Sequence, residues 1–284
     1  MLPPVDRTIR QREGQLCLSE GMTILVLFHR SNDRTVKHFY QEYVCASLQA
    51  DFPKLVSYQR LIELIPGAVV PLCAYLQSRK GDVTGMAFVD SPALKVCHNR
   101  RIHLHRVFQD LAQRGKTSLG WFYGFKLHLI INDQGELLAF KVTPGNVDDR
   151  PPLPEMTKGL SGKLFGDKGD ISHTLFERLH ERGLHLVTKI RQNMKNRLMP
   201  LVDKLLLRKR ALIEPVNDQL KNISQIEHSR HRSVTNAMVN LIAGLLAYTF
   251  QEKLPSLNLR ADDLNELALA GEHYDCLAFP MVTL

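Results

Sequence analysis

The most constraining feature of the sequence is a pair of neighbouring segments in the middle of the chain. Residues 122–131 (FYGFKLHLII) alternate apolar and polar side chains, as a half-buried strand does. Residues 136–143 (ELLAFKVT) indicate a second strand, and the intervening NDQG has the chemistry of a turn. Together they predict a β-hairpin, which commits this part of the chain to a sheet.

The elements expected around this hairpin follow a definite order. They are a strand at 84–90, the hairpin, a strand at 163–167, a helix at 171–183, a strand at 184–190 and helices over 199–254. A hairpin opens the sheet, and helices then alternate with strands. This is the order of an RNase H-like fold, an α/β architecture in which a mixed sheet is flanked by helices. In that fold, metal-binding carboxylates lie at strand ends and on a late helix.

The N-terminal part of the chain has a helical rather than a strand-like pattern of apolar residues. Residues 19–79 carry apolar side chains at helical spacing, with breaks expected at Pro66 and Pro71. The sequence therefore predicts a helical N-terminal region over 1–80, with contact to DNA ends as its expected role. An RNase H-like catalytic domain is predicted over 83–254, and a weakly patterned tail over 255–284.

Charge and composition narrow the class of protein. The 284-residue chain has a formal net charge of +8, which favours a polyanionic partner. Neither GxxxxGK[ST] nor GxGxxG nor HExxH occurs, which disfavours a nucleotide-driven motor, a dinucleotide enzyme and a HExxH zinc enzyme. No signal segment or membrane span is evident, and the five cysteines include no CxxC pair. We therefore expect a soluble, cytoplasmic protein that makes no membrane contact.

Three acidic residues are candidates for the chemistry. Asp90 and Asp167 each end an apolar strand, and Glu214 lies in a late helical segment. Two Mg²⁺ ions that activate one oxygen and stabilise another need a cluster of such carboxylates from distant segments. Asp170, three residues after Asp167, and Glu227, in a later segment, are rival carboxylates.

Basic residues are distributed through the same region. Arg210 and Lys221 share a helix face with Glu214, where they are placed to hold DNA phosphates. Further candidate phosphate contacts are Arg100, Arg101, Lys116, Arg230 and Arg232. The aromatic run Trp121–Phe122–Tyr123 lies among them, and both core packing and stacking on an unpaired base are open interpretations.

These residues resemble a known family. Residues 88–150, LFGDKGDIS (164–172), LLLRKRALIEPVNDQLKN (205–222) and QIEHSRHRS (225–233) are similar to transposases of the insertion-sequence 982 family, within the DDE superfamily. The resemblance implies an RNase H-like catalytic domain with Asp90, Asp167 and Glu214 as the metal-binding triad. It implies two Mg²⁺ ions as cofactors, with Mn²⁺ as an acceptable substitute.

The resemblance also bears on the rival residues and the partners. Related transposases carry a tyrosine, arginine, glutamate, lysine signature whose spacing Arg210, Glu214 and Lys221 match, which selects Glu214 over Glu227. Leu207 occupies the tyrosine position, so that role does not carry over. The implied partners are insertion-sequence ends and target DNA, bound by a homodimer or higher assembly. Alternatives are an RNase H-like nuclease or resolvase and an inactive, element-derived DNA-binding protein.

Overall fold

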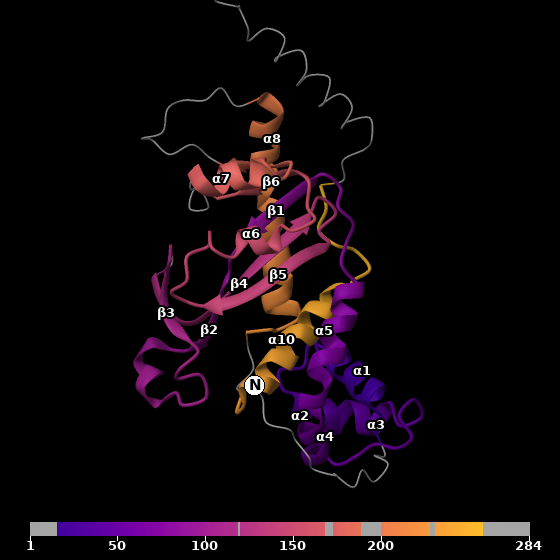
Figure 1. Cartoon of the computed structure of the whole chain (residues 1–284). Coiled ribbons are helices and arrows are strands. Elements are labelled where there is room, and N and C mark those ends of the chain that lie inside the picture. The colour runs from indigo at the N-terminus through magenta and orange to yellow at the C-terminus, as the bar shows by residue number, and fades with distance from the viewer. Residues whose placement is uncertain (1–15, 119, 168–172, 189–199, 228–230, 258–284) are drawn as a thin grey trace, which may run out of the picture. The chain divides into compact units, whose positions relative to one another are not determined.

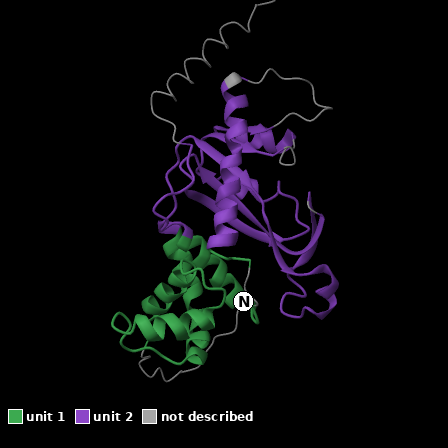
Figure 2. Ribbon diagram, turned by 180° about the vertical axis from the view of Figure 1, so that it is seen from behind, with its two compact units in different colours: residues 1–76, 224–247 green, residues 77–223, 248–284 purple. Residues whose placement is uncertain are grey.

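The computed structural model describes residues 16–118, 120–167, 173–188, 200–227 and 231–257 (Figure 1). The chain divides into two compact units, shown in separate colours in Figure 2. Unit 1 comprises Met1–Leu76 and Ser224–Ala247, and unit 2 comprises Gln77–Ile223 and Tyr248–Leu284. Unit 1 is thus built from two segments that flank most of unit 2 along the chain. The division into functional domains at residues 83 and 254 stays a prediction.

Unit 1 is helical, as the sequence indicated. Its elements are α1 (Leu18–Phe28), α2 (Val36–His38), η1 (Phe39–Val44), α3 (Cys45–Ser47), α4 (Tyr58–Leu64), η2 (Ile65–Ala68), most of α5 (Val69–Ser78) and nearly all of α10 (Val234–Tyr248). Its core gathers Ile24 and Phe28 of α1, Phe39 and Tyr40 of η1, and Leu61 of α4. The predicted break at Pro66 is present as the 3₁₀ turn η2. Pro71 lies in the first turn of α5, where a helix tolerates proline, so no break occurs there.

One described helical stretch, Tyr58–Ser78, has the length and composition needed to cross a membrane. A single such stretch is weak evidence for a span. Leu61, Ile65, Ala68, Leu72 and Leu76 are buried at helical spacing along it. That pattern is typical of a helix that packs one face against a protein core.

Unit 2 contains a seven-stranded mixed sheet. Its strands are β1 (Met86–Asp90), β2 (Ala93–Cys97), β3 (Gln113–Thr117), β4 (Gly120–Asn132), β5 (Leu137–Pro144), β6 (Gly162–Gly166) and β7 (Leu184–Thr188). The central order is β5-β4-β1-β6-β7, in which β4 is antiparallel to β5 and β1, and β1, β6 and β7 run parallel. The predicted hairpin is β4–β5, and the predicted RNase H-like mixed sheet flanked by helices is confirmed.

Helices flank the sheet on both faces (Figures 1 and 2). On one face, α6 (Leu153–Met156) and α7 (His173–His180) pack over a cluster that includes Val89 of β1 and Leu164 of β6. The other face carries the series α8 (Leu201–Lys209), η5 (Arg210–Leu212), α9 (Ile213–Asp218) and η6 (Gln219–Ile223). Strand residues alternate between faces, so Phe88 and Phe165 lie on the face of the sheet away from that cluster. Their rings are stacked there, with centroids 5.3 Å apart.

Strands β2 and β3 and the 3₁₀ segment η3 (Asn99–Leu104) were not predicted. All three are inserted between β1 and β4, and β2 and β3 pair with the N-terminal half of β4. β3 has the sequence QRGKT, which does not alternate apolar and polar side chains. Its extended conformation therefore depends on its pairing with β4. We call η3, β3 and the first two residues of β4, Gly120 and Trp121, the basic arm; Figure 1 shows it projecting from the sheet.

Candidate active site

The sheet brings Asp90 and Asp167 to the same edge. β1 pairs in parallel with β6, with Phe88 opposite Phe165, so the carboxyl ends of both strands are neighbours. Asp90 is the last residue of β1, and Asp167 directly follows β6. Between them lies Arg210, whose Nη2 is 3.6 Å from Asp90 Oδ1 and whose Nη1 is 3.8 Å from Asp167 Oδ1. Two of the three predicted carboxylates therefore share one guanidinium.

The two aspartates differ in environment. The side chain of Asp90 is 31% exposed and that of Asp167 is 62% exposed. Burial raises the pKa of Asp90 above its ordinary value, although Arg210, the Ser91 backbone N–H and Asn217 act in the opposite direction. Asn217 Nδ2 donates a hydrogen bond of 2.7 Å to Asp90 Oδ2. The neighbours of Asp90 therefore only partly offset the free-energy cost of burying its charged form.

Glu214 lies on the helix series that supplies these contacts. Arg210 and Asn217 both contact Asp90 of β1. Lys221 Nζ donates to the carbonyl oxygen of Ala93, the first residue of β2, at 2.7 Å. Residues 210, 214, 217 and 221 are spaced four, three and four apart, as on one helix face. Glu214 is exposed, in the first turn of α9. Pro215 is also in that turn and follows the 3₁₀ segment η5, so α9 accommodates it.

The described residues contain no group of three acidic, histidine or cysteine side chains close enough to hold a metal ion. Two carboxylates and one amide are what the structure brings together. Within the described residues, Asn217 Oδ1 and Arg210 Nε are buried atoms without a hydrogen-bond partner. Carboxylate and amide oxygens are hard ligands of the kind that Mg²⁺ prefers, so the donor set matches that ion in chemistry.

A polar network that the sequence did not reveal lies beside Asp90. Asp149 Oδ1 accepts from Lys126 Nζ at 2.9 Å and lies 3.8 Å from His128 Nδ1. The charge of Asp149 adds to the rise in the pKa of Asp90. The only sequence signal was the acidic pair in PGNVDDR, which looked like an ordinary loop.

His128 links three parts of this network. Its ring nitrogens contact Ser91 Oγ at 2.7 Å and Thr143 Oγ1 at 2.8 Å, so β4 is joined to the end of β1 and to β5. The ring is buried, and burial lowers the pKa of His128 to about 4. The imidazole is therefore neutral at physiological pH and acts as a hydrogen-bonding support beneath the strand that carries Asp90.

The predicted DNA contacts lie in both units. Arg100, Arg101 and Lys116 are exposed on the basic arm, and Arg232 is exposed in unit 1. Arg210 and Lys221 contact protein atoms, as described above. Arg230 and the rival carboxylate Asp170 lie outside the described residues, whereas the other rival, Glu227, belongs to unit 1.

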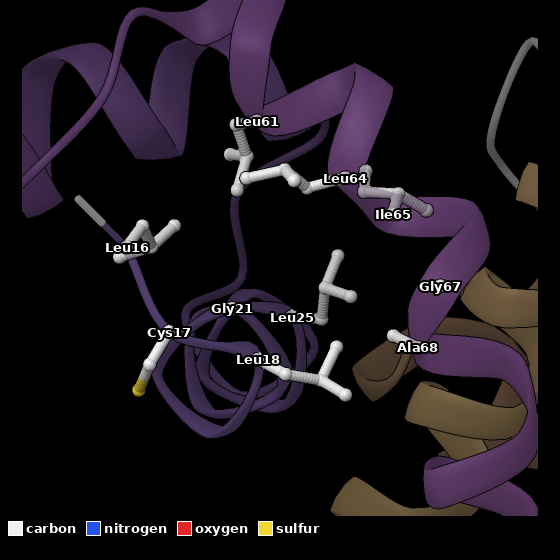
Figure 3. A pocket seen from close by; sticks show the side chains of 10 residues that line it. All are labelled: Leu16, Cys17, Leu18, Gly21, Leu25, Leu61, Leu64, Ile65, Gly67 and Ala68. Carbon is white, nitrogen blue, oxygen red and sulfur yellow. The ribbon is translucent and has the colours of Figure 1, made fainter. Parts of the chain in front are cut away.

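The apolar pocket in unit 1 has a different character. It is a cavity of about 180 Å³ between α1 and the α4–η2 turn. Figure 3 shows Leu18 and Leu25 of α1 and Leu61, Leu64 and Ile65 of the α4–η2 segment around it. Among the residues that line it none carries a charge, so it offers nothing for phosphodiester chemistry.

Comparison with known proteins assigns the chain to a family. A family model described as "Transposase DDE domain" matches residues 80–234, more than half of the chain. A comparison with curated proteins finds no match. The matched region spans the sheet, the α8–η6 series, Asp90, Asp167 and Glu214.

Proposed function

Because the chain belongs to the transposase DDE domain family, we propose that it cuts DNA at the ends of an insertion sequence and joins those ends to target DNA. The observation that carries this proposal is the meeting of Asp90 and Asp167 around Arg210 at the carboxyl edge of two parallel strands. A transposase of this kind works on DNA, and the net charge of +8 suits that partner.

We assign Asp90, Asp167 and Glu214 as the catalytic carboxylates. The third assignment is supported by the helix face on which Arg210 and Asn217, on either side of Glu214, both contact Asp90. These carboxylates would hold two Mg²⁺ ions, or Mn²⁺ in their place, which supply activation of the attacking oxygen and stabilisation of the leaving oxygen. Water first hydrolyses a phosphodiester, and the freed 3′-hydroxyl then attacks a target phosphodiester and displaces the target's own 3′-oxygen, which leaves as a hydroxyl.

The surrounding residues have supporting roles. Asn217 holds the Asp90 carboxylate by its amide N–H, and His128 and Asp149 brace the strand beneath it. Arg210 supplies the positive charge that keeps Asp90 and Asp167 close together, and it is placed to contact a phosphate at the same edge. Lys221 anchors the helix to β2 and is the second proposed phosphate contact of this face.

We also propose that the chain belongs to the insertion-sequence 982 branch and acts in the cytoplasm as a homodimer or higher assembly on DNA. The branch is supported by the long motifs over residues 88–150 and 205–222. The assembly follows from the reaction, since two element ends have to be joined to one target. A structure-specific nuclease would share the same carboxylates but would not use a DNA hydroxyl as its nucleophile.

The test is cleavage of a supercoiled plasmid that carries the element's ends, in Mg²⁺. Asp90→Asn, Asp167→Asn and Glu214→Gln should each reduce cleavage by roughly 100-fold or more, because each removes a charged ligand. Glu227→Gln is the matched control, because it is the rival carboxylate and lies in unit 1. Equal cleavage by wild type and Glu214→Gln would remove Glu214 from the active site.

Labelled element ends extend the test to strand transfer. Joined products identify a transposase, whereas cleavage without joining identifies a nuclease. DNA binding in EDTA without cleavage in Mg²⁺ would identify an inactive DNA-binding protein and overturn the proposed function.

A further inference from the structure

The basic arm presents an exposed aromatic ring with two cations over it. Trp121 is the only tryptophan of the chain, and 56% of its surface is exposed. The Arg114 guanidinium lies 5.5 Å from the ring centroid, and Lys116 Nζ lies 5.7 Å from it. The neighbouring Phe122 and Tyr123 are buried, so core packing accounts for those two residues but not for Trp121.

The sheet register fixes this arrangement. Lys116 is paired directly with Trp121 across the β3–β4 ladder, and Arg114 is two residues along the same face of β3. Gly115, between them, faces the other way and lies against the Phe122 ring and the carbonyl oxygen of Gly145. β3 is therefore packed closely on β4, and its two cations are held over the Trp121 ring.

The arm carries a strong excess of positive charge. From Lys95 to Asn132 the chain contains a single acidic residue, Asp110. Arg100 and Arg101 are exposed on η3, and Asn99 Nδ2 ties that segment to the carbonyl oxygen of Trp121 at 2.8 Å. A stacking aromatic side chain among cations is the combination by which proteins hold single-stranded nucleic acid.

The arm projects past the edge of the sheet that carries the aspartates. β4 runs antiparallel to β1, and Asp90 is paired with Leu129. Residues of β4 before Leu129 therefore extend beyond the carboxyl end of β1. Trp121 is eight residues along β4 from Leu129, which corresponds to about 26 Å of strand. That length equals roughly eight nucleotide steps of DNA, so one strand can reach both places.

We propose that the basic arm binds unpaired DNA beside the active site, with Trp121 stacked on a base and Arg114 and Lys116 on the flanking phosphates. This inference rests on the proposed function, because it assumes that the carboxyl edge of the sheet receives DNA. It adds a preference for an unpaired base, since the ring can stack only on a base whose face is open.

The single tryptophan makes the inference directly measurable. In EDTA, a short single-stranded oligonucleotide should quench the Trp121 emission more strongly than a fully paired duplex of the same sequence. With a labelled oligonucleotide, Trp121→Ala should weaken binding by roughly 5- to 150-fold, and Trp121→Phe should retain most of the affinity. Val83→Ala is the matched control, because Val83 is an exposed apolar residue before the opposite end of β1.

Two outcomes would overturn the inference. One is binding of the labelled oligonucleotide with no change in Trp121 emission. The other is equal affinity of Trp121→Ala and Val83→Ala. Because these measurements need no metal and no cleavage, the arm can fail this test while the plasmid reaction succeeds. Conversely, quenching by single-stranded DNA in a protein that never cleaves DNA would uphold the arm and overturn the proposed function.

Discussion

Asn217 is the residue whose contacts most directly suggest a role beyond the carboxylates. Its amide orientation follows from the hydrogen bond to Asp90, because the carboxylate accepts and only the amide nitrogen can donate. That leaves Asn217 Oδ1 buried, with no hydrogen-bond partner among the described residues. A buried amide oxygen without a partner normally costs free energy, so this oxygen is a candidate contact for an ordered water or a ligand at this edge.

Asn217→Ala should therefore reduce plasmid cleavage by about 10- to 100-fold with little change in the free energy of unfolding. The measurement is cleavage rate against Mg²⁺ concentration, which should show a higher metal requirement. Asn222→Ala is the control, since Asn222 is exposed and its side chain donates a hydrogen bond to Asp218, four residues before it. If the two variants cleave at the same rate and with the same Mg²⁺ dependence, Asn217 has no positioning role.

The buried side chain of His29 is expected to make the stability of unit 1 depend on pH. The ring is buried, Nδ1 donates to the carbonyl oxygen of Ser224 at 2.5 Å, and burial lowers the pKa of His29 to about 4. The fold favours the neutral form, so the unfolded chain binds a proton more readily. This contribution to stability is present above about pH 6.5 and is lost as the pH falls from there towards the folded pKa.

Urea unfolding followed by circular dichroism should show the free energy of unfolding falling between pH 6.5 and 4. Each buried histidine contributes about 1.4 kcal/mol per pH unit in that window. His128 and His231 have pKa values lowered to about 4 as well, so His29→Gln should reduce the slope without abolishing it. An unchanged slope in His29→Gln would show that this histidine titrates normally.

Some of these residues were predictable and others were not. Asp90 and Asp167 were predicted as candidates because each stands at the end of a short apolar strand, and such strand ends are visible in the sequence. Asn217 and Asp149 were missed because their significance comes from partners far away in the chain, Asp90 in one case and Lys126 in the other. An asparagine within a helix and an aspartate in a loop carry no local signal of that kind.

At the scale of elements, the basic arm depends on glycines at close backbone contacts. A Cβ atom on Gly115 would lie 2.1 Å from the Gly145 carbonyl oxygen, and one on Gly124 would lie 2.0 Å from that of Leu94. Gly124 also has a φ of +157°. β4 bonds to both β2 and β3 at this residue, beside the register shift in β2. β3 (QRGKT) has no apolar pattern, and the short apolar run of β2 (ALKVC) does not reveal its register on β4, so these contacts were not predicted.

Gly115→Ala and Gly124→Ala should each destabilise the protein by about 1–3 kcal/mol, because backbone atoms have to move apart. Urea unfolding followed by Trp121 fluorescence reports the change at the arm itself. Gly21→Ala is the matched control: it lies within α1, and nothing is within 4 Å of the added Cβ. That variant should be more stable by up to about 1 kcal/mol. Equal destabilisation in all three variants would contradict this account of the arm.

At the scale of the whole molecule, unit 1 is completed by a segment from late in the sequence. His29 contacts the carbonyl oxygen of Ser224, and Gly244 of α10 lies against Ile226 and the His29 ring. Val239, Ala243 and Leu246 of α10 are buried. The first 76 residues therefore lack part of their core without residues 224–247.

A chain that ends at Ile223 should lose the cooperative unfolding transition of unit 1 while keeping the sheet. The expected signature is a lower helical circular dichroism signal and rapid proteolysis before residue 76, with β4 and β5 still protected from hydrogen exchange. A chain that ends at Leu257 is the control and should unfold like the full protein. Protection of α1 in the shorter chain would show that residues 1–76 fold by themselves.

Because unit 1 is made of two segments far apart in the sequence, its folding during synthesis is delayed. During synthesis, residues 77–223 leave the ribosome between the two segments of that unit. At ordinary elongation rates this delay is roughly 7–30 s. Throughout that interval the earliest helices of a nascent molecule wait with apolar side chains uncovered, which makes the half-made polypeptide a natural client for chaperones.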